Sequence, residues 1–539
     1  MAVMGNQDFF CTIRVRNRKQ VCMSHQLQRL FKHDILLIAL ISYFLATRTS
    51  VILQRLVPFQ FDHGKDEIAV LHMFLTTTPK LIGPWTSIPG LFFGPAWYYL
   101  LLPGTILFQA DPIAPVLTMV LLGVITISYV YYTFGKIEAI ILTASSVFYT
   151  VTSSAWNPFP MVFLSFIILG QLKSLESKHQ LLVRTACLLG LAAGFGFHFS
   201  TAFAIFFPLL IALSIIFKKI KVSIKSLLTL ILSFCAPFLP QLLFEIRHNF
   251  LETKAVLTYL HTGDTNPASF EKLKEILFSL LGEIKEVLAP SGYWVLTNFN
   301  TAFQLVFLVI IIVGIYFFQH SQQNRRGYLL LDASLWFSLP ILAFTYFHFN
   351  VWYLLPLFSF TIIILGQIVR ALPQSLKLIF LSLYLVMSIS KLAFFLIEDG
   401  PQLLQTTSFL TVKESAINYI YQQAGEKSFA SYQFMPDIYD YPYQYLYFTH
   451  ALRGERLPTE FSYQPNEISY IPEKLDLLNY FVNQADNRQP ELIFYIIEGQ
   501  RESSLYDQWW SRQQHGELLQ EQAISANLTV ITALPEPTK

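Results

Sequence analysis

The sequence predicts a polytopic α-helical membrane protein that ends in a soluble α/β domain. Of the 539 residues, 53% are hydrophobic and 13% are charged, and the mean hydropathy is +0.46, which is typical of chains with several membrane spans. The net charge is only +2 and the basic residues are scattered, so no nucleic-acid partner is expected. Roughly the last 140 residues alternate strand-like and helix-like patterns, which predicts the small α/β domain.

The N-terminal segment 1–33 carries several Lys and Arg residues and precedes an apolar run over residues 35–53. Basic flanks stay in the cytosol, so this segment is predicted to be a cytosolic leader. The apolar run is long enough to cross a hydrocarbon layer of about 30 Å and ends without a small-residue cleavage site. We therefore expect a retained first helix that enters the membrane from inside.

The remaining membrane portion contains a series of further apolar runs. They lie near residues 91–109, 113–132, 137–153, 159–172, 181–197, 199–217, 225–243, 301–319, 328–347, 350–369 and 374–397. Clusters of Lys and Arg near residues 173–184, 218–225, 325–326 and 370–377 mark cytosolic loops. If every apolar run crossed the membrane, these loops could not all be cytosolic, so one of the early runs does not cross.

The run 91–109 is the best candidate for a segment that does not cross. It contains Pro95 and Pro103 and three consecutive aromatic residues, and this composition suits an interfacial helix better than a straight span. The predicted membrane domain, residues 34–397, then has about eleven spans.

This topology divides the chain into three parts: the leader, the membrane domain and a C-terminal domain at 398–539. Two long loops of the membrane domain, 54–112 and 246–300, are predicted to be external. The C-terminal domain is predicted to lie on the same external side. The expected location is a plasma (inner) membrane.

The first external loop gathers three carboxylates, an imidazole and an ammonium in Asp62-His63-Gly64-Lys65-Asp66-Glu67. Carboxylates can accept protons during a reaction, and a neighbouring cation can hold an anionic group. Taken alone, the local sequence favours solvated loop carboxylates over a functional cluster. The spacing between His63 and Asp66 or Glu67 is also compatible with a bound divalent cation if the segment is helical.

Two further segments each have two interpretations. Residues 270–288 have apolar positions at helical spacing, so they form a helix that either covers a cavity or simply packs on the bundle. The tyrosine-rich segment 439–447, with Asp437, Asp440 and His450 nearby, suits either sugar binding or the packing of a domain interface.

Several motifs carry a resemblance to a known family. Asp66-Glu67 follows the first span, as the acidic motif does in that family. The other matching segments are IGPWTSIPGLFFGPAWYYLLLPG at 82–104, SSAWNPFPMVF at 153–163, PQLLFEIRHNF at 240–250 and NVWYLLPLFSF at 350–360. Together they resemble the C-type (GT-C) superfamily of membrane glycosyltransferases, in the branch of the protein O-mannosyltransferases and the lipid A aminoarabinose transferase.

The resemblance implies an enzyme with a GT-C-like bundle that moves a sugar from a polyprenyl-phosphate carrier to a hydroxyl acceptor on the external face, with inversion. Asp66 would be the general base, Glu67 its neighbour in the motif, and Asp62 a support or second carboxylate. The chain departs from the pattern at Asn157, where many relatives carry an aspartate.

The resemblance also suggests binding residues. Arg247 and His248 would hold the donor phosphate, with Lys65 as a weaker candidate because the phosphate-binding lysine pattern of the aminoarabinose branch is missing from this loop. The substrate cavity would be lined by Trp97, Tyr98, Trp156, Asn157 and Tyr353. The implied partners are the polyprenyl-phosphate-linked sugar, membrane lipid, and an acceptor that is a protein, a lipid or a glycan; no cofactor is implied.

Two other functions stay open: a transporter or flippase of lipid-linked glycans, and a noncatalytic membrane assembly subunit. Transporters commonly have repeated halves and ionisable residues near the bilayer midplane. No internal repeat is evident here, and the spans carry few charges apart from end positions such as Glu138 and Lys391. The pattern therefore favours catalysis in the external loops.

Overall fold

The computed structural model describes residues 34–262, 269–320, 323–394, 397, 406–435, 439–467, 470–514 and 516–536. The predicted leader 1–33, the predicted domain boundary at residue 398 and Asp437 lie outside these residues.

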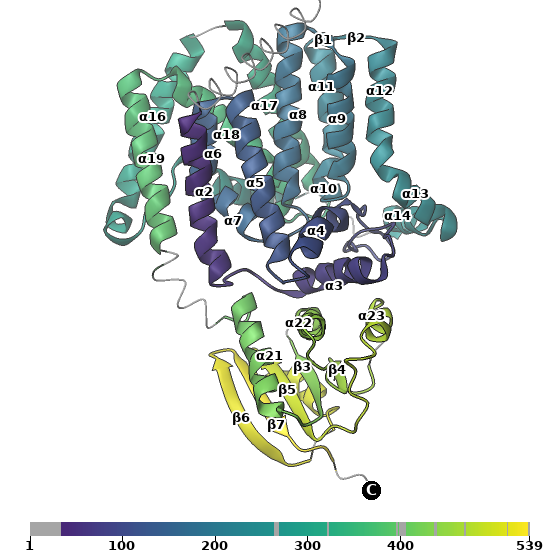
Figure 1. Ribbon diagram of the computed structural model, residues 1–539. Helices are drawn as coiled ribbons and strands as arrows, with labels where there is room; N and C mark the ends of the chain where they lie inside the picture. Colours follow the sequence, from purple (N-terminus) through teal and green to yellow (C-terminus); the bar gives the residue numbers. More distant parts are fainter. Residues whose placement is uncertain are drawn as a thin grey trace, which may run out of the picture.

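A helical bundle forms the larger part of the molecule (Figure 1). Its helices are α2 (Ile35–Leu53), α5 (Ala114–Thr133), α6 (Lys136–Ala144), α7 (Ser146–Ser153), α8 (Pro160–Lys178), α9 (Val183–Gly196), α10 (Thr201–Ala204), α11 (Phe206–Phe217), α12 (Ile224–Cys235), α16 (Asn300–His320), α17 (Gln323–Phe344), α18 (Leu355–Ala371) and α19 (Gln374–Phe394). Short strands β1 (Gln180–Leu181) and β2 (Lys221–Val222) pair at one end of the bundle. The predicted polytopic fold class is confirmed.

Within the described residues, six helical stretches are long and apolar enough to cross a membrane. They are 35–53, 114–133, 224–247, 296–320, 351–371 and 374–394. Other predicted spans are built from shorter pieces: the run 137–153 breaks at Ser145, whose backbone is extended with ψ 134°. The count of about eleven spans therefore stays a prediction.

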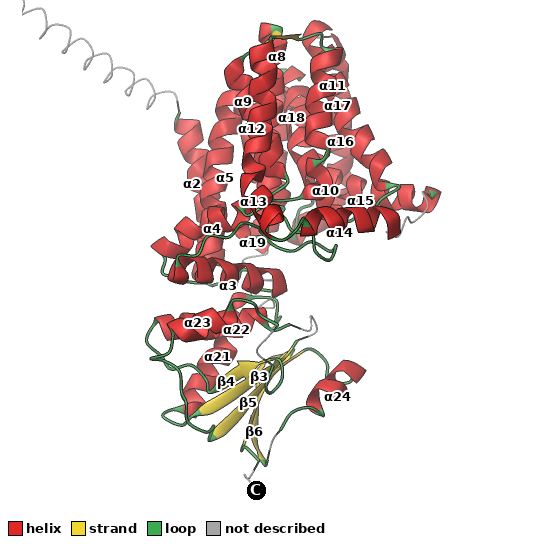
Figure 2. Ribbon diagram, turned by 90° about the vertical axis from the view of Figure 1, so that its right-hand side faces the viewer, coloured by secondary structure: helices red, strands yellow, loops and turns green. Residues whose placement is uncertain are grey.

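Several helices gather at the end of the bundle that faces the C-terminal domain (Figures 1 and 2). They are α3 (Phe61–Thr76), α4 (Ala96–Leu107), α13 (Leu239–Arg247), α14 (Leu251–Thr262) and α15 (Phe270–Leu288). At 12 residues, α4 is about 18 Å long, too short to cross a hydrocarbon layer of about 30 Å. The amphipathic helix predicted over 270–288 is present with the same bounds.

The C-terminal domain is a five-stranded sheet with order β4-β3-β5-β7-β6. The strands are β3 (Phe429–Phe434), β4 (Glu460–Ser462), β5 (Leu492–Glu498), β6 (Leu518–Ser525) and β7 (Leu528–Ala533), and the helices are α21 (Leu410–Ala424), α22 (Tyr441–Leu452), α23 (Lys474–Tyr480) and α24 (Ser504–Trp510). β3 is parallel to β4 and β5, whereas β7 is antiparallel to β5 and β6. The three strands and one helix predicted here, near 428–433, 491–498, 528–534 and 411–423, are confirmed.

Helices α22 and α23 lie between the sheet and α3 (Figure 2). One continuous hydrophobic core runs from the bundle through α22 into the sheet. Polar links join the same two parts: the Arg55 guanidinium contacts Glu414 at 2.6 Å and Asp111 at 2.9 Å, and Lys80 contacts Glu473 at 2.7 Å. The C-terminal domain is therefore packed firmly beneath α3.

The backbones of the two parts approach each other tightly at Gly64. A Cβ added to this residue would lie 2.4 Å from the backbone nitrogen of Pro442. We expect Gly64→Ala to push α22 away and lower the free energy of unfolding by about 1–3 kcal/mol, measured by thermal or denaturant unfolding. Gly282→Ala, at a helical glycine with nothing within 4 Å of the added Cβ, is the matched control. Equal stability of the two variants would contradict the close contact.

Candidate functional site

Helix α3 carries the whole predicted acidic cluster. It begins at Phe61, so Asp62 and Asp66 both lie within the helix. The N-terminal cap is Gln60, whose backbone N–H donates to Nδ1 of His63 at 3.2 Å. Asp62 instead lies in the first turn, where a carboxylate is favoured by the helix dipole.

Asp66 is buried, with 3% of its surface exposed. Its Oδ2 accepts a hydrogen bond of 2.8 Å from the indole N–H of Trp97, and its Oδ1 has no hydrogen-bond partner among the described residues. The Lys65 ammonium lies 4.0 Å from that Oδ1. Burial raises the pKa of Asp66 to about 7, against the opposing effect of Lys65.

Asp62 lies one helical turn before Asp66 and is more open, with 43% of its side chain exposed. Lys65 contacts its Oδ1 at 2.8 Å, and the Trp156 indole donates to its Oδ2 at 3.2 Å. Burial alone would raise the pKa of Asp62, but Lys65, His63 and Trp156 outweigh it, and the pKa is lowered. The pKa values of Asp62 and Asp66 are thus shifted in opposite directions. Such a difference lets two neighbouring carboxylates take separate acid and base roles.

His63 is partly buried, and both of its ring nitrogens are engaged. Its Nδ1 accepts from the Gln60 backbone, so Nε2 carries the proton and donates to the Ser154 hydroxyl at 3.1 Å. Burial lowers the pKa of His63 to about 4. The ring is neutral, with both nitrogens engaged, and the described residues contain no group of three or more His, Cys, Asp or Glu side chains placed to hold a metal ion.

Glu67 lies next to Tyr445 of α22 and also within electrostatic reach of Asp111 and Arg55, so it lies where the C-terminal domain meets the membrane domain. It is 5% exposed, and burial raises its pKa well above the usual range, against the lowering effect of the Tyr445 hydroxyl. Its Oε2 has no hydrogen-bond partner among the described residues. Asp66 and Glu67 are therefore adjacent in sequence but belong to different environments.

Comparison with known proteins is informative at the level of structure. No model of a known protein family matches the chain, and no curated protein does. The crystal structure of ArnT from Cupriavidus metallidurans bound to undecaprenyl phosphate has a TM-score of 0.56 and 10% identity, and the match covers 93% of this chain and 98% of that one. The apo structure of the same protein has a TM-score of 0.55 and 10% identity, covering 92% and 97%.

The chain has the GT-C fold. The predicted fold resemblance is confirmed over nearly its whole length, including the C-terminal domain.

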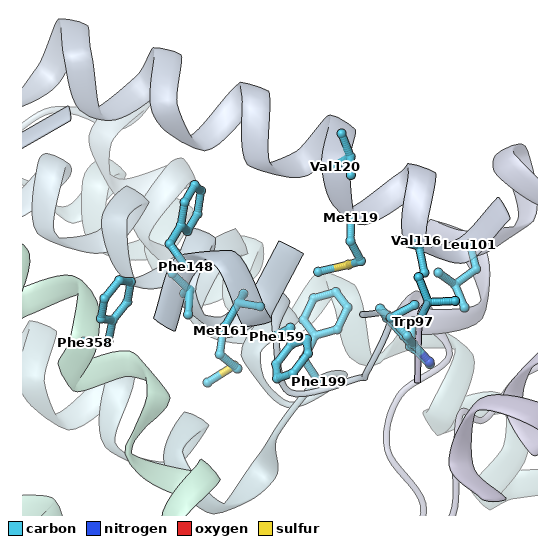
Figure 3. Packing of buried hydrophobic residues seen from close by; sticks show 14 of the residues in the cluster. Trp97, Leu101, Val116, Met119, Val120, Phe148, Phe159, Met161, Phe199 and Phe358 are labelled. Carbon is cyan, nitrogen blue, oxygen red and sulfur yellow. The ribbon is translucent and has the colours of Figure 1, made fainter. Parts of the chain in front are cut away.

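The predicted cavity residues are distributed around α3. Trp97 is fully buried beside Asp66 and packs edge-on against Phe199 at 6.5 Å, at the end of the side-chain cluster in Figure 3. Tyr98 is 6% exposed. The Asn157 amide donates to the Phe199 carbonyl oxygen at 2.8 Å.

Trp156 and Tyr353 lie on the other side of the cluster, linked by Trp352. The Trp156 and Trp352 rings are 5.3 Å apart, and the Trp352 and Tyr353 rings are 6.1 Å apart. Trp156 also donates to Asp62. The structure therefore brings this aromatic group to the acidic cluster.

Arg247 and His248, the predicted phosphate-binding pair, lie at the end of α13. Both are exposed, and the His248 ring stacks on Phe244 at 4.0 Å. No hydrogen bond or ion pair among the described residues joins either of them to Asp62, Lys65 or Asp66. Of the three predicted phosphate-binding residues, only Lys65 lies within the acidic cluster.

A cavity of about 540 Å³ is lined in part by Trp352. It is mostly apolar, and Leu280, Ile284 and Val287 of α15 line one wall. Of the two interpretations of the amphipathic helix, the structure therefore supports the one in which it borders a cavity. Arg48 of α2 also lines this cavity; sequence reasoning missed it, although a lone arginine within a span is itself a sign of function.

The tyrosine-rich segment forms α22, and its side chains are buried. Tyr443, Tyr445 and Tyr447 are each at most 1% exposed. The Tyr445 hydroxyl donates to the Ala110 carbonyl oxygen of the bundle at 2.8 Å, and the Tyr447 hydroxyl donates to Ser431 of β3 at 2.6 Å. These tyrosines pack the domain interface.

Proposed function

We propose that the chain is a glycosyltransferase that moves a sugar from a polyprenyl-phosphate carrier to a hydroxyl acceptor, with Asp66 as general base. One observation carries the proposal: Asp66 is buried, and Trp97 fixes one of its oxygens. The other oxygen has no hydrogen-bond partner among the described residues and lies 4.0 Å from the Lys65 ammonium. A pKa of about 7 matches a group that exchanges protons near neutral pH. The shared fold with ArnT, whose structure holds undecaprenyl phosphate, supports the class of donor.

In the proposed step the acceptor oxygen attacks the anomeric carbon of the sugar. The new carbon–oxygen bond forms as the bond to the carrier phosphate breaks, and the acceptor proton passes to the free oxygen of Asp66. Attack opposite the leaving phosphate inverts the anomeric configuration. The phosphate leaves as a dianion or monoanion and needs cationic partners.

Lys65 is the first candidate for that cation, since its ammonium lies beside both Asp62 and Asp66. Arg247 and His248 remain proposed as an outer contact for the phosphate, reached from the exposed end of α13. Asp62, held ionised, orients Lys65. Glu67 is proposed to support the motif from the side of the C-terminal domain.

The proposed location is a plasma (inner) membrane, with the N-terminus cytosolic and α3 and the C-terminal domain outside. The positions of the basic loops support this orientation. A carrier lipid would then present its sugar at the same face as the acidic cluster.

The pH dependence of transfer follows from Asp66. The base acts in its ionised form, and the ionised fraction rises as pH rises through a pKa of about 7. We expect kcat/KM to increase from pH 5.5 to 8.5, with its midpoint near that pKa. A rate that is flat across this range would argue against Asp66 as the base.

The proposal is tested by incubating the purified protein with a polyprenyl-phosphate sugar and a mixture of candidate hydroxyl acceptors. Release of the free lipid phosphate at the rate of sugar transfer is the expected result. A protein that binds the donor but never releases lipid phosphate with any acceptor class would support the assembly-subunit alternative.

A further inference from the structure

The cavity bordered by α15 contains a buried charge without a counterion. Arg48 is 2% exposed within α2, the first predicted span. Its Nη1 donates to the Thr47 hydroxyl at 2.7 Å, and its Nε and Nη2 donate to the Thr152 hydroxyl at 3.2 and 3.0 Å. No carboxylate of the described residues lies within 4.0 Å of the guanidinium.

The contacts that Arg48 does make position it without neutralising it. Its guanidinium carbon lies 4.1 Å from the centre of the Phe44 ring and 4.8 Å from that of the Tyr149 ring. The hydroxyls of Thr47 and Thr152 donate hydrogen bonds to the backbone carbonyl oxygens of Phe44 and Phe148. Toward Arg48 they therefore act as acceptors. A guanidinium has five N–H donors, and three of them are used here.

Other polar groups in the same cavity are also unsatisfied. The hydroxyls of Ser145 and Ser388 have no hydrogen-bond partner among the described residues, their residues are 2% and 8% exposed, and both line the cavity. Lys391 lines it too, paired with Glu286 at 2.9 Å. Glu286 already neutralises Lys391, but buried polar groups are normally bonded and buried charges normally paired, so Arg48, Ser145 and Ser388 together indicate a missing anion with several acceptor oxygens.

Much of the remaining lining is apolar, with Phe159, Leu280, Leu354, Leu357, Phe358 and Leu392 among its residues, and Glu283 and Glu286 of α15 are also part of it. A free inorganic anion leaves that surface uncovered, whereas a lipid tail fills it. A volume of about 540 Å³ lies within the range of small-ligand sites.

We propose that this cavity binds the phosphate group of an anionic lipid, with Arg48 as its charge partner, Ser145 and Ser388 as hydrogen-bond donors, and the lipid tail along α15. The site is separate from the acidic cluster on α3, and the Trp352–Trp156 pair stands between the two. Arg48 is thus a binding residue that positions a phospholipid-like molecule next to the proposed active site.

The experiment measures binding of undecaprenyl phosphate, which carries no sugar, to the purified full-length protein in detergent micelles. No transfer is needed, so failure of the proposed enzyme activity leaves the result intact. Arg48→Gln is expected to bind about tenfold to a hundredfold more weakly than wild type, whereas undecaprenol, which lacks the phosphate, binds both equally. Arg184→Gln, at an exposed arginine, is the matched control and binds as wild type does.

Competition experiments distinguish a bilayer phospholipid from the isoprenoid carrier as the lipid that supplies the phosphate. Full displacement by phosphatidylglycerol assigns the site to a bilayer phospholipid, and resistance to it assigns the site to the isoprenoid carrier. Equal displacement by inorganic phosphate alone would overturn the role of the apolar lining.

Two further measurements keep the proposal falsifiable if Arg48→Gln does not fold. The Ser145→Ala, Ser388→Ala double variant keeps the charge and is expected to bind more weakly. A diazirine placed next to the phosphate of the lipid should crosslink to α7 and α15. Unchanged affinity in both the arginine and the serine variants, or crosslinks confined to α13 and α14, would overturn the proposal.

Discussion

Asp66→Asn is expected to lower the rate of sugar transfer by about a hundredfold to ten-thousandfold while the protein stays folded. The amide keeps an oxygen that can accept the Trp97 N–H bond, so the local geometry is preserved. It cannot accept the proton from the attacking hydroxyl. The measurement is single-turnover release of lipid phosphate, with donor binding determined on the same preparation.

Asp66→Asn is not expected to lower the stability of the protein, in contrast to its effect on transfer. The folded-state pKa of Asp66, about 7, lies above the usual 3.8, so the ionised form is disfavoured in the folded protein. This cost appears as pH rises above the unfolded pKa and is complete above the folded one. At pH 8 Asp66→Asn should therefore be at least as stable as wild type. A loss of activity together with a loss of stability would indicate a structural role instead.

Asp476→Asn is the matched control for both measurements. Asp476 has 64% of its side chain exposed, and its carboxylate lies 3.0 Å from Nε2 of His72. Its amide should leave transfer unchanged. Glu67→Gln is expected to reduce transfer less than Asp66→Asn, because Glu67 lies next to Tyr445 of α22, at the contact with the C-terminal domain.

Lys413→Met is expected to have the largest effect on stability. Lys413 and Glu498 form an ion pair inside the C-terminal domain, with 1% and 4% of their side chains exposed, and the Tyr443 hydroxyl donates to the same carboxylate at 2.5 Å. Removing the cation leaves a buried carboxylate uncompensated, which costs about 3–5 kcal/mol. Denaturant unfolding of the full chain, with limited proteolysis of residues 406–536, measures the loss.

An ion pair at the surface of the same domain provides the comparison. Arg501 and Glu521 are 2.6 Å apart but have 34% and 55% of their side chains exposed. Arg501→Met should therefore cost less than about 1 kcal/mol. Equal effects of the two methionine substitutions would contradict the buried character of the Lys413 pair. Because α22 packs on α3, Lys413→Met should also lower transfer activity.

The sequence predicts most of this architecture because apolar periodicity is strong in it. The helix over 270–288 has its observed bounds, since its apolar positions recur at helical spacing between polar ends. The buried strands β3, β5 and β7 are equally clear. β4 has only three residues and β6 is largely exposed and polar, so neither carries a hydrophobic strand signal.

The candidate site is predictable only in part, for reasons of distance along the chain. Asp66 follows from its place after the first span, but its Trp97 partner is 31 residues away. The start of α3 depends on a cap by Gln60 and His63 that composition does not mark. Arg48 lies within an apolar run, and its partner Thr152 is 104 residues away. Only the folded structure reveals that no carboxylate of the described residues pairs with this charge.

In the proposed function, the protein breaks the bond between a sugar and a carrier phosphate. The most direct test uses proteoliposomes containing the purified protein and a polyprenyl-phosphate sugar with separate labels on the sugar and the phosphate. We expect the two labels to separate, with the sugar on the acceptor and the phosphate on the free lipid, and we expect Asp66→Asn to abolish this separation. Movement of both labels together across the bilayer, without separation, would contradict the proposed function and identify a flippase.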